Sequence, residues 1–294
     1  MPRANPFSLI VLPIALLLVA MTSIQGGASL AKSLFPLVGA EGTTALRLCF
    51  AAIILALIMR PWRARLSLAS CRSLLGYGLA LGGMNLLFYM SIKTIPLGIA
   101  VALEFTGPLG LALLSSRRLL DFVWIALAVF GIWLLLPTQQ SAAPLDPLGM
   151  ALALAAGLCW ALYIIFGQQA GAAHGAHTVA LGTLVAALLV TPVGLYSAGG
   201  ALFSLDLLPV ALAVAVLSSA LPYSLEMIAL TRLPARTFST LMSMEPAIAA
   251  LSGLLFLGER LAAQQWLAIG AIILASAGAA ATIKPKVRSQ RLEP

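Results

Sequence analysis

Two stretches of the sequence follow one pattern: TIPLGIAVALEFTGPLGLAL at residues 94–113 and RLPARTFSTLMSMEPAIAAL at residues 232–251. Each contains two prolines twelve positions apart, which are Pro96 and Pro108 in the first stretch and Pro234 and Pro246 in the second. Each also carries a carboxylate shortly before its inner proline, Glu104 in the first and Glu245 in the second. The two stretches lie about half the chain apart, which indicates an internal duplication.

The composition around these stretches is that of a membrane protein. Hydrophobic residues make up 61% of the 294 residues and charged residues only 9%, and the mean hydropathy is +1.05. Apolar segments of about 17–23 residues are long enough to cross the ~30 Å hydrocarbon core as helices. The sequence predicts about ten such helices, at residues 9–30, 43–60, 73–92, 97–115, 121–137, 148–168, 178–198, 207–229, 236–257 and 262–283.

The basic residues predict which side of the membrane each loop occupies. With the N-terminus inside, most of the 17 Lys and Arg residues fall in inner loops and tails, and the outer side holds Lys32, Lys93 and Arg260. This asymmetry places both termini in the cytoplasm. The net charge of +8 is therefore explained by topology, with some contact to anionic lipid, and not by nucleic-acid binding.

A duplication of five helices has a consequence for the orientation of its copies. Because five is odd, the second copy enters the membrane from the opposite side, which makes the copies inverted repeats. We expect an all-α membrane protein with repeats at residues 1–138 and 139–294, and a substrate site between them near the middle of the membrane. Each of three prolines removes a backbone hydrogen bond and predicts a helix break: Pro108, Pro222 and Pro246.

Four charged residues fall inside predicted spans: Arg47, Glu104, Glu226 and Glu245. Each costs roughly 2.5–3.5 kcal/mol near a helix centre, so all four together cost on the order of 10–14 kcal/mol if unpaired. That cost rivals the ~5–15 kcal/mol stability of a typical fold, so these groups must be paired, hydrated in a cavity or neutral. A static Arg47–Glu104 pair that only fixes packing is one alternative. Arg47 can also extend its side chain outward to water.

Further polar residues share helix faces with small or aromatic ones. In the first predicted helix, Gln25 lies on one face with Thr22, Ser29 and Lys32. In the third, Asn85 and Tyr89 follow Gly78 and Gly82 on one stripe, which fits interhelical hydrogen bonds as well as substrate contact.

Aromatic and small residues mark the second half in the same way. Tyr163 shares a face with Trp160, a pair more typical of packing than of a substrate box, and Tyr223 precedes Glu226 in the eighth helix. In the last helix, Ala271, Ala275 and Ala279 form a packing face, either internal or between two copies, so monomer and homodimer both remain open.

Several function classes lack their motifs. The three cysteines form no CxxC pair, and His174 and His177 are predicted loop residues, so no metal site is indicated. No GxxxxGK, HExxH or GxSxG motif occurs, which argues against a nucleotide-driven pump, an enzyme or a cofactor. Residues 1–31 fit a cleaved signal peptide less well than a retained helix because the apolar run is too long.

The second half resembles the EamA-type drug/metabolite transporter superfamily, most specifically in the LP, EP and GE elements of residues 222–260. The matching positions are Pro234, Glu245, Pro246, Gly258 and Glu259. The first half departs from this pattern, because Gly107 precedes Pro108 where the second copy has Glu245. Runs such as MTSIQGGASLAKSLFPLVGA at 21–40 and ALPYSLEMIALTRLP at 220–234 are similar to bacterial inner-membrane exporters of threonine and homoserine.

The resemblance implies ten helices, cytoplasmic termini and export of small amino acids by proton antiport. We therefore hypothesise that Glu104 binds the substrate ammonium or the coupling proton, and that Arg47 or a helix end binds the carboxylate. Candidates for the hydroxyl and for the cavity lining are Gln25, Asn85, Tyr89 and Tyr223. Further candidates for substrate binding or proton coupling are Tyr163, Glu226 and Glu245. An exporter of cationic drugs is a rival hypothesis, although only 7% of the chain is aromatic. A membrane scaffold that transports nothing is another.

Overall fold

The computed structural model describes residues 6–31, 33–63, 68–95, 97–135, 146–248, 251 and 263–282, and the regular elements in these ranges are helices. The first half contains α1 (Pro6–Ala31), α2 (Phe35–Met59), η1 (Pro61–Arg63), α3 (Leu68–Ser91), α4 (Leu97–Ser115) and α5 (Leu119–Leu135). The second half begins with α6 (Pro147–His174), α7 (His177–Ala198), η2 (Gly199–Phe203) and η3 (Leu205–Leu207). It continues with α8 (Leu208–Ala215), the π-helical turn η4 (Val216–Ala220), α9 (Leu221–Arg232), α10 (Ala235–Met242) and α12 (Ala263–Ala281).

Length and apolar composition identify membrane spans among the described residues. Five helical segments are long and apolar enough to cross a membrane: Phe35–Met59, Cys71–Ser91, Pro147–His174, His177–Phe203 and Leu205–Arg232. Shorter apolar helices cover Val11–Gly27, Leu103–Ser115, Leu119–Leu134 and Trp266–Ala279. The chain is thus an all-helical multi-pass membrane protein. The Gly258–Glu259 element, Lys32, Pro96 and most of the basic C-terminal tail lie outside the described residues.

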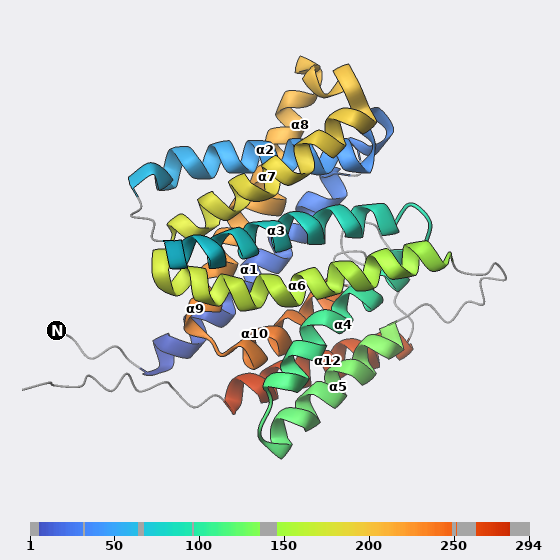
Figure 1. Cartoon of the computed structure of the whole chain (residues 1–294). Coiled ribbons are helices and arrows are strands. Elements are labelled where there is room, and N and C mark those ends of the chain that lie inside the picture. Colours follow the sequence, from blue (N-terminus) through green and yellow to red (C-terminus); the bar gives the residue numbers. More distant parts are fainter. Residues whose placement is uncertain are drawn as a thin grey trace, which may run out of the picture.

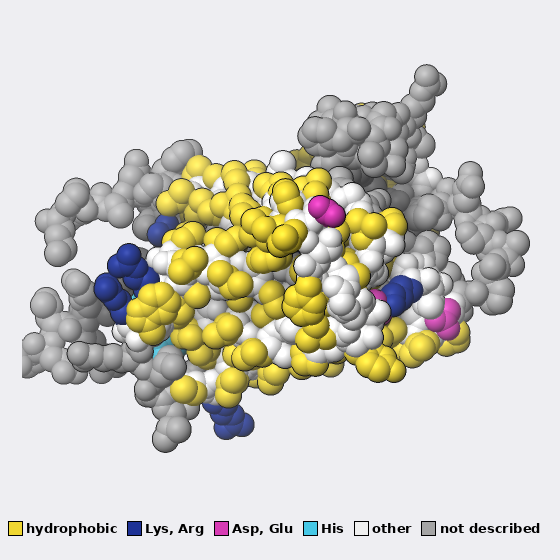
Figure 2. All heavy atoms as spheres, turned by 90° about the horizontal axis from the view of Figure 1, so that it is seen from above, with side chains coloured by type: hydrophobic (Ala, Val, Ile, Leu, Met, Phe, Trp, Pro, Cys, Tyr) yellow, Lys and Arg dark blue, Asp and Glu magenta, His cyan; other side chains and the backbone are white. Residues whose placement is uncertain are grey.

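The surface has the character that a lipid environment requires. Large apolar side chains such as Leu114, Leu188 and Leu267 are exposed, and Figure 2 shows hydrophobic side chains covering the middle of the face in view. Dark blue Lys and Arg side chains in that view gather mainly at the end where α1 begins and α2 ends (Figures 1 and 2). The first turn of α1 and the last turn of α12 lie at this same end.

The main helix contacts connect the two halves of the sequence. Helix α2 packs against α7, α3 against α6, α4 against α6 and α10, and α5 against α12 (Figure 1). Helix α1 packs against α9 and the π-helical turn, where the Ser23 hydroxyl donates to the Leu217 carbonyl at 2.7 Å. On α12, Ala275 and Ala279 are buried, so at least part of that small-residue face serves contacts inside the chain.

Helix α2 starts earlier than the predicted segment 43–60 and bends at Gly39. The Gly39 backbone has φ 69° and ψ 178°, a conformation that essentially only glycine adopts. The bend turns the buried Glu41 toward Lys93, at the junction of α3 and α4, with which it forms an ion pair. Hydropathy alone did not reveal this bend, because the charged and small residues around it lower the apolar signal at the start of the helix.

A Gly39→Ala substitution should therefore destabilise the protein. Forcing a Cβ into this backbone conformation costs roughly 1–3 kcal/mol. We expect a lower apparent melting temperature in detergent, measured by the loss of helical circular dichroism on heating. Gly270→Ala in α12 is the matched control, since an added Cβ there meets nothing within 4 Å. Equal melting temperatures for the two variants would contradict the assigned strain.

Helix α6, which carries several residues of the interior, has a defined start. The Asp146 carboxylate accepts hydrogen bonds from the Leu148 and Gly149 N–H groups at 3.2 and 3.0 Å, a typical N-cap. A hydrogen bond from the Thr94 side chain, together with these backbone bonds, lowers the pKa of Asp146 below its usual value. The cap thus ties the start of α6 to the turn that precedes α4.

Helices α4 and α6 cross at very short range. A Cβ built on Gly107 would collide with the Gly157 backbone carbonyl, and one built on Gly157 would collide with the Glu104 carbonyl. These obstacles are backbone atoms, so no side-chain movement relieves them. Glycine at both positions fixes where α4 presents Glu104.

Each of the three prolines predicted to break a helix has a different local effect. A helix break was predicted at Pro108. Helix α4 instead continues through Pro108 to Ser115, so the helix is not interrupted at this proline. Proline still removes one N–H group, but the turns on either side and the close contact with α6 support the helix. Pro222 directly follows the start of α9, after the π-helical turn. Helix α10 ends at Met242, and a helix resumes at residues 244–248 around Pro246.

Candidate functional site

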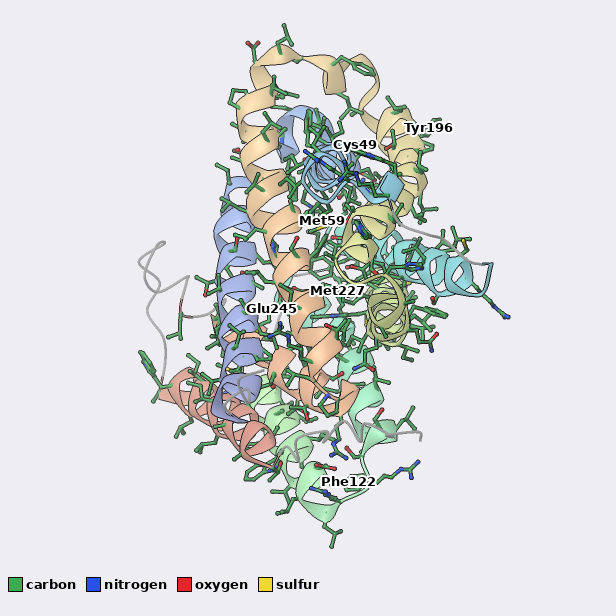
Figure 3. The ribbon with its side chains drawn as sticks, turned by 90° about the vertical axis from the view of Figure 1, so that its left-hand side faces the viewer. Cys49, Met59, Phe122, Tyr196, Met227 and Glu245 are labelled. Carbon is green, nitrogen blue, oxygen red and sulfur yellow. The ribbon has the colours of Figure 1, made fainter. Side chains whose placement is uncertain are left out.

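The interior holds a cavity of about 220 Å³ to which α1, α2, α3, α4, α6, α9, α10 and the π-helical turn contribute. The predicted candidates that line it are Gln25, Arg47, Asn85, Tyr89, Glu104, Tyr223, Glu226 and Glu245. Figure 3 shows Glu245 beside α1 near the middle of the view, while Tyr196 and Phe122 lie toward its edges. The structure therefore brings all the predicted binding candidates except Tyr163 around one space.

Arg47 is the positive group of this cavity. Its side chain is buried (6% exposed) and donates to the Asn85 side-chain oxygen and, at 3.3 Å, to the Tyr89 hydroxyl. Its guanidinium also lies 5.2 Å from the centroid of the Tyr89 ring. The Tyr223 hydroxyl donates to the same Asn85 oxygen at 3.2 Å. Arg47 thus points inward and does not extend to water.

The Arg47 charge has no carboxylate partner among the described residues. The ion pairs in that part of the chain are Lys93–Glu41 and Arg236–Asp121, the latter at 3.4 Å, and no described carboxylate oxygen lies within 4.0 Å of an Arg47 guanidinium nitrogen. The Arg47 Nε atom is buried and has no hydrogen-bond partner. The static Arg47–Glu104 pair considered from the sequence is therefore not formed. Arg47 is therefore a buried cation whose hydrogen-bond partners in the described part of the chain, Asn85 and Tyr89, are neutral groups.

Three carboxyl groups line the same cavity in different surroundings. Glu226 on α9 is 4% exposed and accepts a hydrogen bond from the Tyr163 hydroxyl at 2.9 Å. Glu104 on α4 is 8% exposed. Neither Glu104 nor Glu245 has a hydrogen-bond donor among the described residues. Glu245 lies close enough to interact electrostatically with both of the others.

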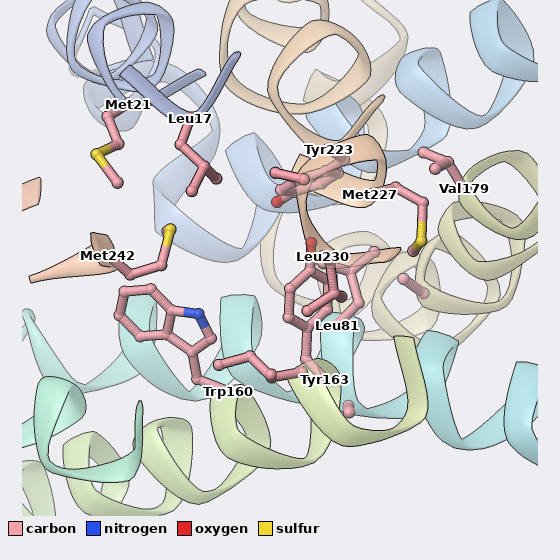
Figure 4. Close-up of a cluster of buried hydrophobic side chains, with 14 of the residues drawn as sticks. Leu17, Met21, Leu81, Trp160, Tyr163, Val179, Tyr223, Met227, Leu230 and Met242 are labelled. Atoms are coloured by element: carbon pink, nitrogen blue, oxygen red, sulfur yellow. The ribbon is translucent and has the colours of Figure 1, made fainter. Parts of the chain in front are cut away.

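Tyr163 supports this site from behind and does not line it. It projects from α6 toward α9, and its ring stacks on Tyr77 with centroids 5.0 Å apart. Figure 4 shows Trp160 and Tyr163 rising from α6 on one side and Tyr223 descending from α9 on the other. Trp160 does line the cavity, and its ring packs edge-on against Phe105 at 5.4 Å. Of the pair Trp160 and Tyr163, which the sequence suggested to be packing residues, Tyr163 packs behind the site and Trp160 lines the cavity.

The rest of the lining is mostly apolar, and apart from Trp160 and Pro246 it did not stand out in the sequence. These residues are Ile24, Met84, Phe88, Val101, Phe105, Trp160, Ser218, Met242 and Pro246. Some lie three positions from a polar candidate: Phe88 follows Asn85 by three, and Val101 precedes Glu104 by three. Helical neighbours at this spacing share a face, so the buried polar residues were the signal that locates them.

Comparisons with known proteins agree with this arrangement. Residues 147–280 match the EamA-like transporter family. The chain is 62% identical over 282 residues to the threonine/homoserine exporter RhtA of Escherichia coli strain K12, covering 96% of each protein. It is 61% identical, with the same coverage, to the protein of that name from Salmonella typhimurium strain LT2.

A solved structure resembles the fold as well. This crystal structure superposes with a TM-score of 0.76, covering 94% of this chain and 97% of the other, at 17% identity. At that identity the likeness concerns the fold alone. The overall helical fold is thus one that has also been observed by crystallography.

Proposed function

This chain belongs to the EamA-like transporter family, and we propose that it exports threonine- or homoserine-like amino acids across a bacterial inner membrane. It is a multi-pass membrane exporter and not an enzyme. The relatives named above are exporters of these two amino acids. The finer mechanism proposed below is proton antiport with alternating access.

The observation that carries the proposal is the charge arrangement of the cavity. An amino acid presents a carboxylate and an ammonium group together. The buried Arg47, with no carboxylate within 4.0 Å among the described residues, is suited to the first. A carboxylate among the three carboxyl groups that line the cavity is suited to the second. Charged hydrogen bonds of this kind are worth roughly 1.5–3 kcal/mol each, which suffices to select a zwitterion over a neutral solute.

The same cavity is less suited to a cationic drug. Its volume of about 220 Å³ is below the roughly 300–1,000 Å³ of sites for drug-sized ligands. A monocation would also have to enter beside the Arg47 guanidinium. Both features favour a small zwitterion over the rival substrate class.

The pairing of helices supports two inverted repeats at residues 1–138 and 139–294. If α1 corresponds to α6, α2 to α7, α3 to α8–α9 and α5 to α12, then the contact of α3 with α6 corresponds to that of α9 with α1. The pairs α2 with α7 and α5 with α12 map onto themselves. Such a two-fold relation permits alternating access by movement of one repeat against the other.

The distribution of basic side chains supports a proposed orientation in the membrane and a proposed contact with lipid. The end with the basic side chains faces the cytoplasm in our proposal, by the positive-inside rule. Both chain ends then lie on that side, and the basic groups meet anionic lipid headgroups. The driving force is the proton gradient.

Reconstitution tests the proposed function directly. Purified protein in proteoliposomes loaded with unlabelled threonine should accumulate labelled threonine and homoserine by counterflow. Valine, which lacks the hydroxyl, and a cationic dye serve as comparison solutes. Accumulation of the dye without the amino acids would favour a drug exporter. Movement of no solute, in protein that remains monodisperse, would favour a scaffold and contradict the proposal.

A further inference from the structure

The cavity contains more carboxyl groups than cations. Glu104, Glu226 and Glu245 face one described cation, Arg47. Ionised carboxylates that share an apolar site repel one another, and a proton held by one of them relieves the repulsion. At least one carboxyl group is thus expected to be protonated in the empty cavity. A bound amino acid brings its ammonium group to these carboxyl groups, where it takes the place of the proton.

The hydrogen bonds distinguish Glu226 from the other two. The Tyr163 hydroxyl donates to Glu226 at 2.9 Å, and donation to a carboxylate stabilises its ionised form. The stacked Tyr77 ring holds Tyr163 in place from behind. One oxygen of Glu226 is therefore occupied by a fixed donor, while the residue still lines the cavity. The Tyr163 hydrogen bond thus suits Glu226 to stay ionised and to bind a cationic group of the substrate.

Glu104 and Glu245 have the opposite surroundings. Neither has a hydrogen-bond donor among the described residues, both line the same cavity, and Glu245 is near enough for its charge to act on Glu104. Their neighbours in the lining are largely apolar, among them Val101, Phe105 and Met242. They come from the two stretches that share one sequence pattern, next to Pro108 and Pro246. Two carboxyl groups that line one cavity without donors are suited to sharing one proton.

Other charged and titratable groups lie on the helices around the cavity. Among the described residues they are Arg47 on α2, Tyr77 and Tyr89 on α3, Cys159 and Tyr163 on α6, and Tyr223 and Glu226 on α9. Tyr89, Tyr223 and Arg47 form a network with Asn85, and Glu226 is bonded to Tyr163. None of these groups donates a hydrogen bond to Glu104 or Glu245 in the described chain. Because no described side chain donates to Glu104 or Glu245, water can supply the proton that these two carboxyl groups bind.

We propose that the carboxyl groups divide two tasks: Glu226 stays ionised and binds the substrate ammonium, while Glu104 and Glu245 together carry one exchangeable proton. This inference rests on the proposed function. In each cycle the proton binds to a carboxylate oxygen of the pair from the outer water after the substrate has left. It is released to the inner water when the next amino acid binds. No bond other than the O–H bond forms or breaks.

Two transport assays separate these tasks. Exchange of labelled for unlabelled threonine at equal pH requires substrate binding but no net proton movement. Transport driven by an imposed pH gradient requires both. We expect Glu104→Gln and Glu245→Gln to retain exchange and to lose the acceleration by the gradient. We expect Glu226→Gln to lose exchange and driven transport together.

Tyr163→Phe tests the supporting hydrogen bond. Without this donor, Glu226 should bind ammonium less well, and the half-saturating threonine concentration for exchange should rise roughly two- to tenfold, the range expected for one hydrogen bond. The response to the pH gradient should persist, because Glu104 and Glu245 are intact. Loss of that response in Tyr163→Phe would contradict the division of tasks.

A measurement on the wild-type protein tests the inference without depending on whether the variants fold. Addition of threonine to wild-type protein in weakly buffered detergent should release one proton for each substrate bound, as linkage between the two ligands requires. No release, or exchange retained by Glu226→Gln, would overturn the inference. Failure of the wild type to exchange threonine or homoserine at all would instead overturn the proposed function.

Discussion

An Arg47→Gln protein is expected to reach the membrane in normal amounts and to exchange no measurable threonine. Arg47 is the buried cation of the cavity, and among the described residues its guanidinium donates hydrogen bonds to Asn85 and Tyr89. Truncating one partner of a buried charge pair costs roughly 2–5 kcal/mol, which is at least about 30-fold in affinity for the substrate carboxylate. Counterflow in proteoliposomes, normalised to the amount of inserted protein, measures this loss.

The apparent stability of this variant should not fall. In the empty cavity the Arg47 charge has no carboxylate partner among the described residues, so its removal relieves a cost of roughly 2.5–3.5 kcal/mol that a charge bears inside a membrane. A melting temperature equal to or above that of the wild type is expected. A large decrease would mean that Arg47 acts mainly in packing.

Two controls sharpen this prediction. Lys93→Gln removes a cation that is half exposed and paired with Glu41 away from the cavity lining, and it should leave exchange nearly unchanged. The second control changes the substrate. Wild-type protein should discriminate strongly against threoninol, which lacks the carboxylate, whereas Arg47→Gln should not. Discrimination retained by the variant would assign the carboxylate to another group.

Gly157→Ala should impair both folding and transport. A Cβ on Gly157 collides with the Glu104 carbonyl and lies 3.1 Å from the Glu104 carbonyl carbon, so α6 and α4 must separate. Overpacking of this kind typically costs 1–3 kcal/mol, and the displacement of α4 carries Glu104 away from the other carboxyl groups. A lower yield of monodisperse protein, a lower melting temperature and loss of gradient-driven transport are expected.

Gly110→Ala provides the matched comparison. Gly110 lies in the same α4 helix, and an added Cβ there meets nothing within 4 Å. Alanine is also favoured over glycine in a helix by roughly 1 kcal/mol. This variant should be at least as stable as the wild type and should transport normally. Similar defects in both glycine variants would show that α4 tolerates no added methyl group, and would remove the specific role of the α4–α6 crossing.

The sequence predicted the parts of the site that carry a cost in a membrane. Charged residues inside apolar spans are expensive, so Arg47, Glu104, Glu226 and Glu245 stood out without any knowledge of the fold, and all four line the cavity. Asn85 and Tyr89 were predicted by their place on one helix face, and both contact Arg47. Here interhelical bonding and cavity lining, which were treated as alternatives, occur together.

Contacts between segments that are far apart in the chain could not be predicted from the sequence. The hydrogen bond from Tyr163 to Glu226 joins residues 63 positions apart, and no periodic pattern specifies it. The bend at Gly39 depends on a single φ angle that hydropathy does not register. The effect of each proline also depended on its neighbours, since α4 continues through Pro108 whereas α10 ends shortly before Pro246.

The interlocked contacts of the two halves bear on how this protein is made. Helices α2, α3 and α5 have their main partners in α7, α6 and α12, all of which leave the ribosome later. The early helices must therefore wait in the bilayer with Arg47 and Glu104 not yet enclosed. A chain terminated before α6 should be recognised by quality-control proteases and not persist as a folded half, whereas the two halves synthesised together as separate chains should restore one another.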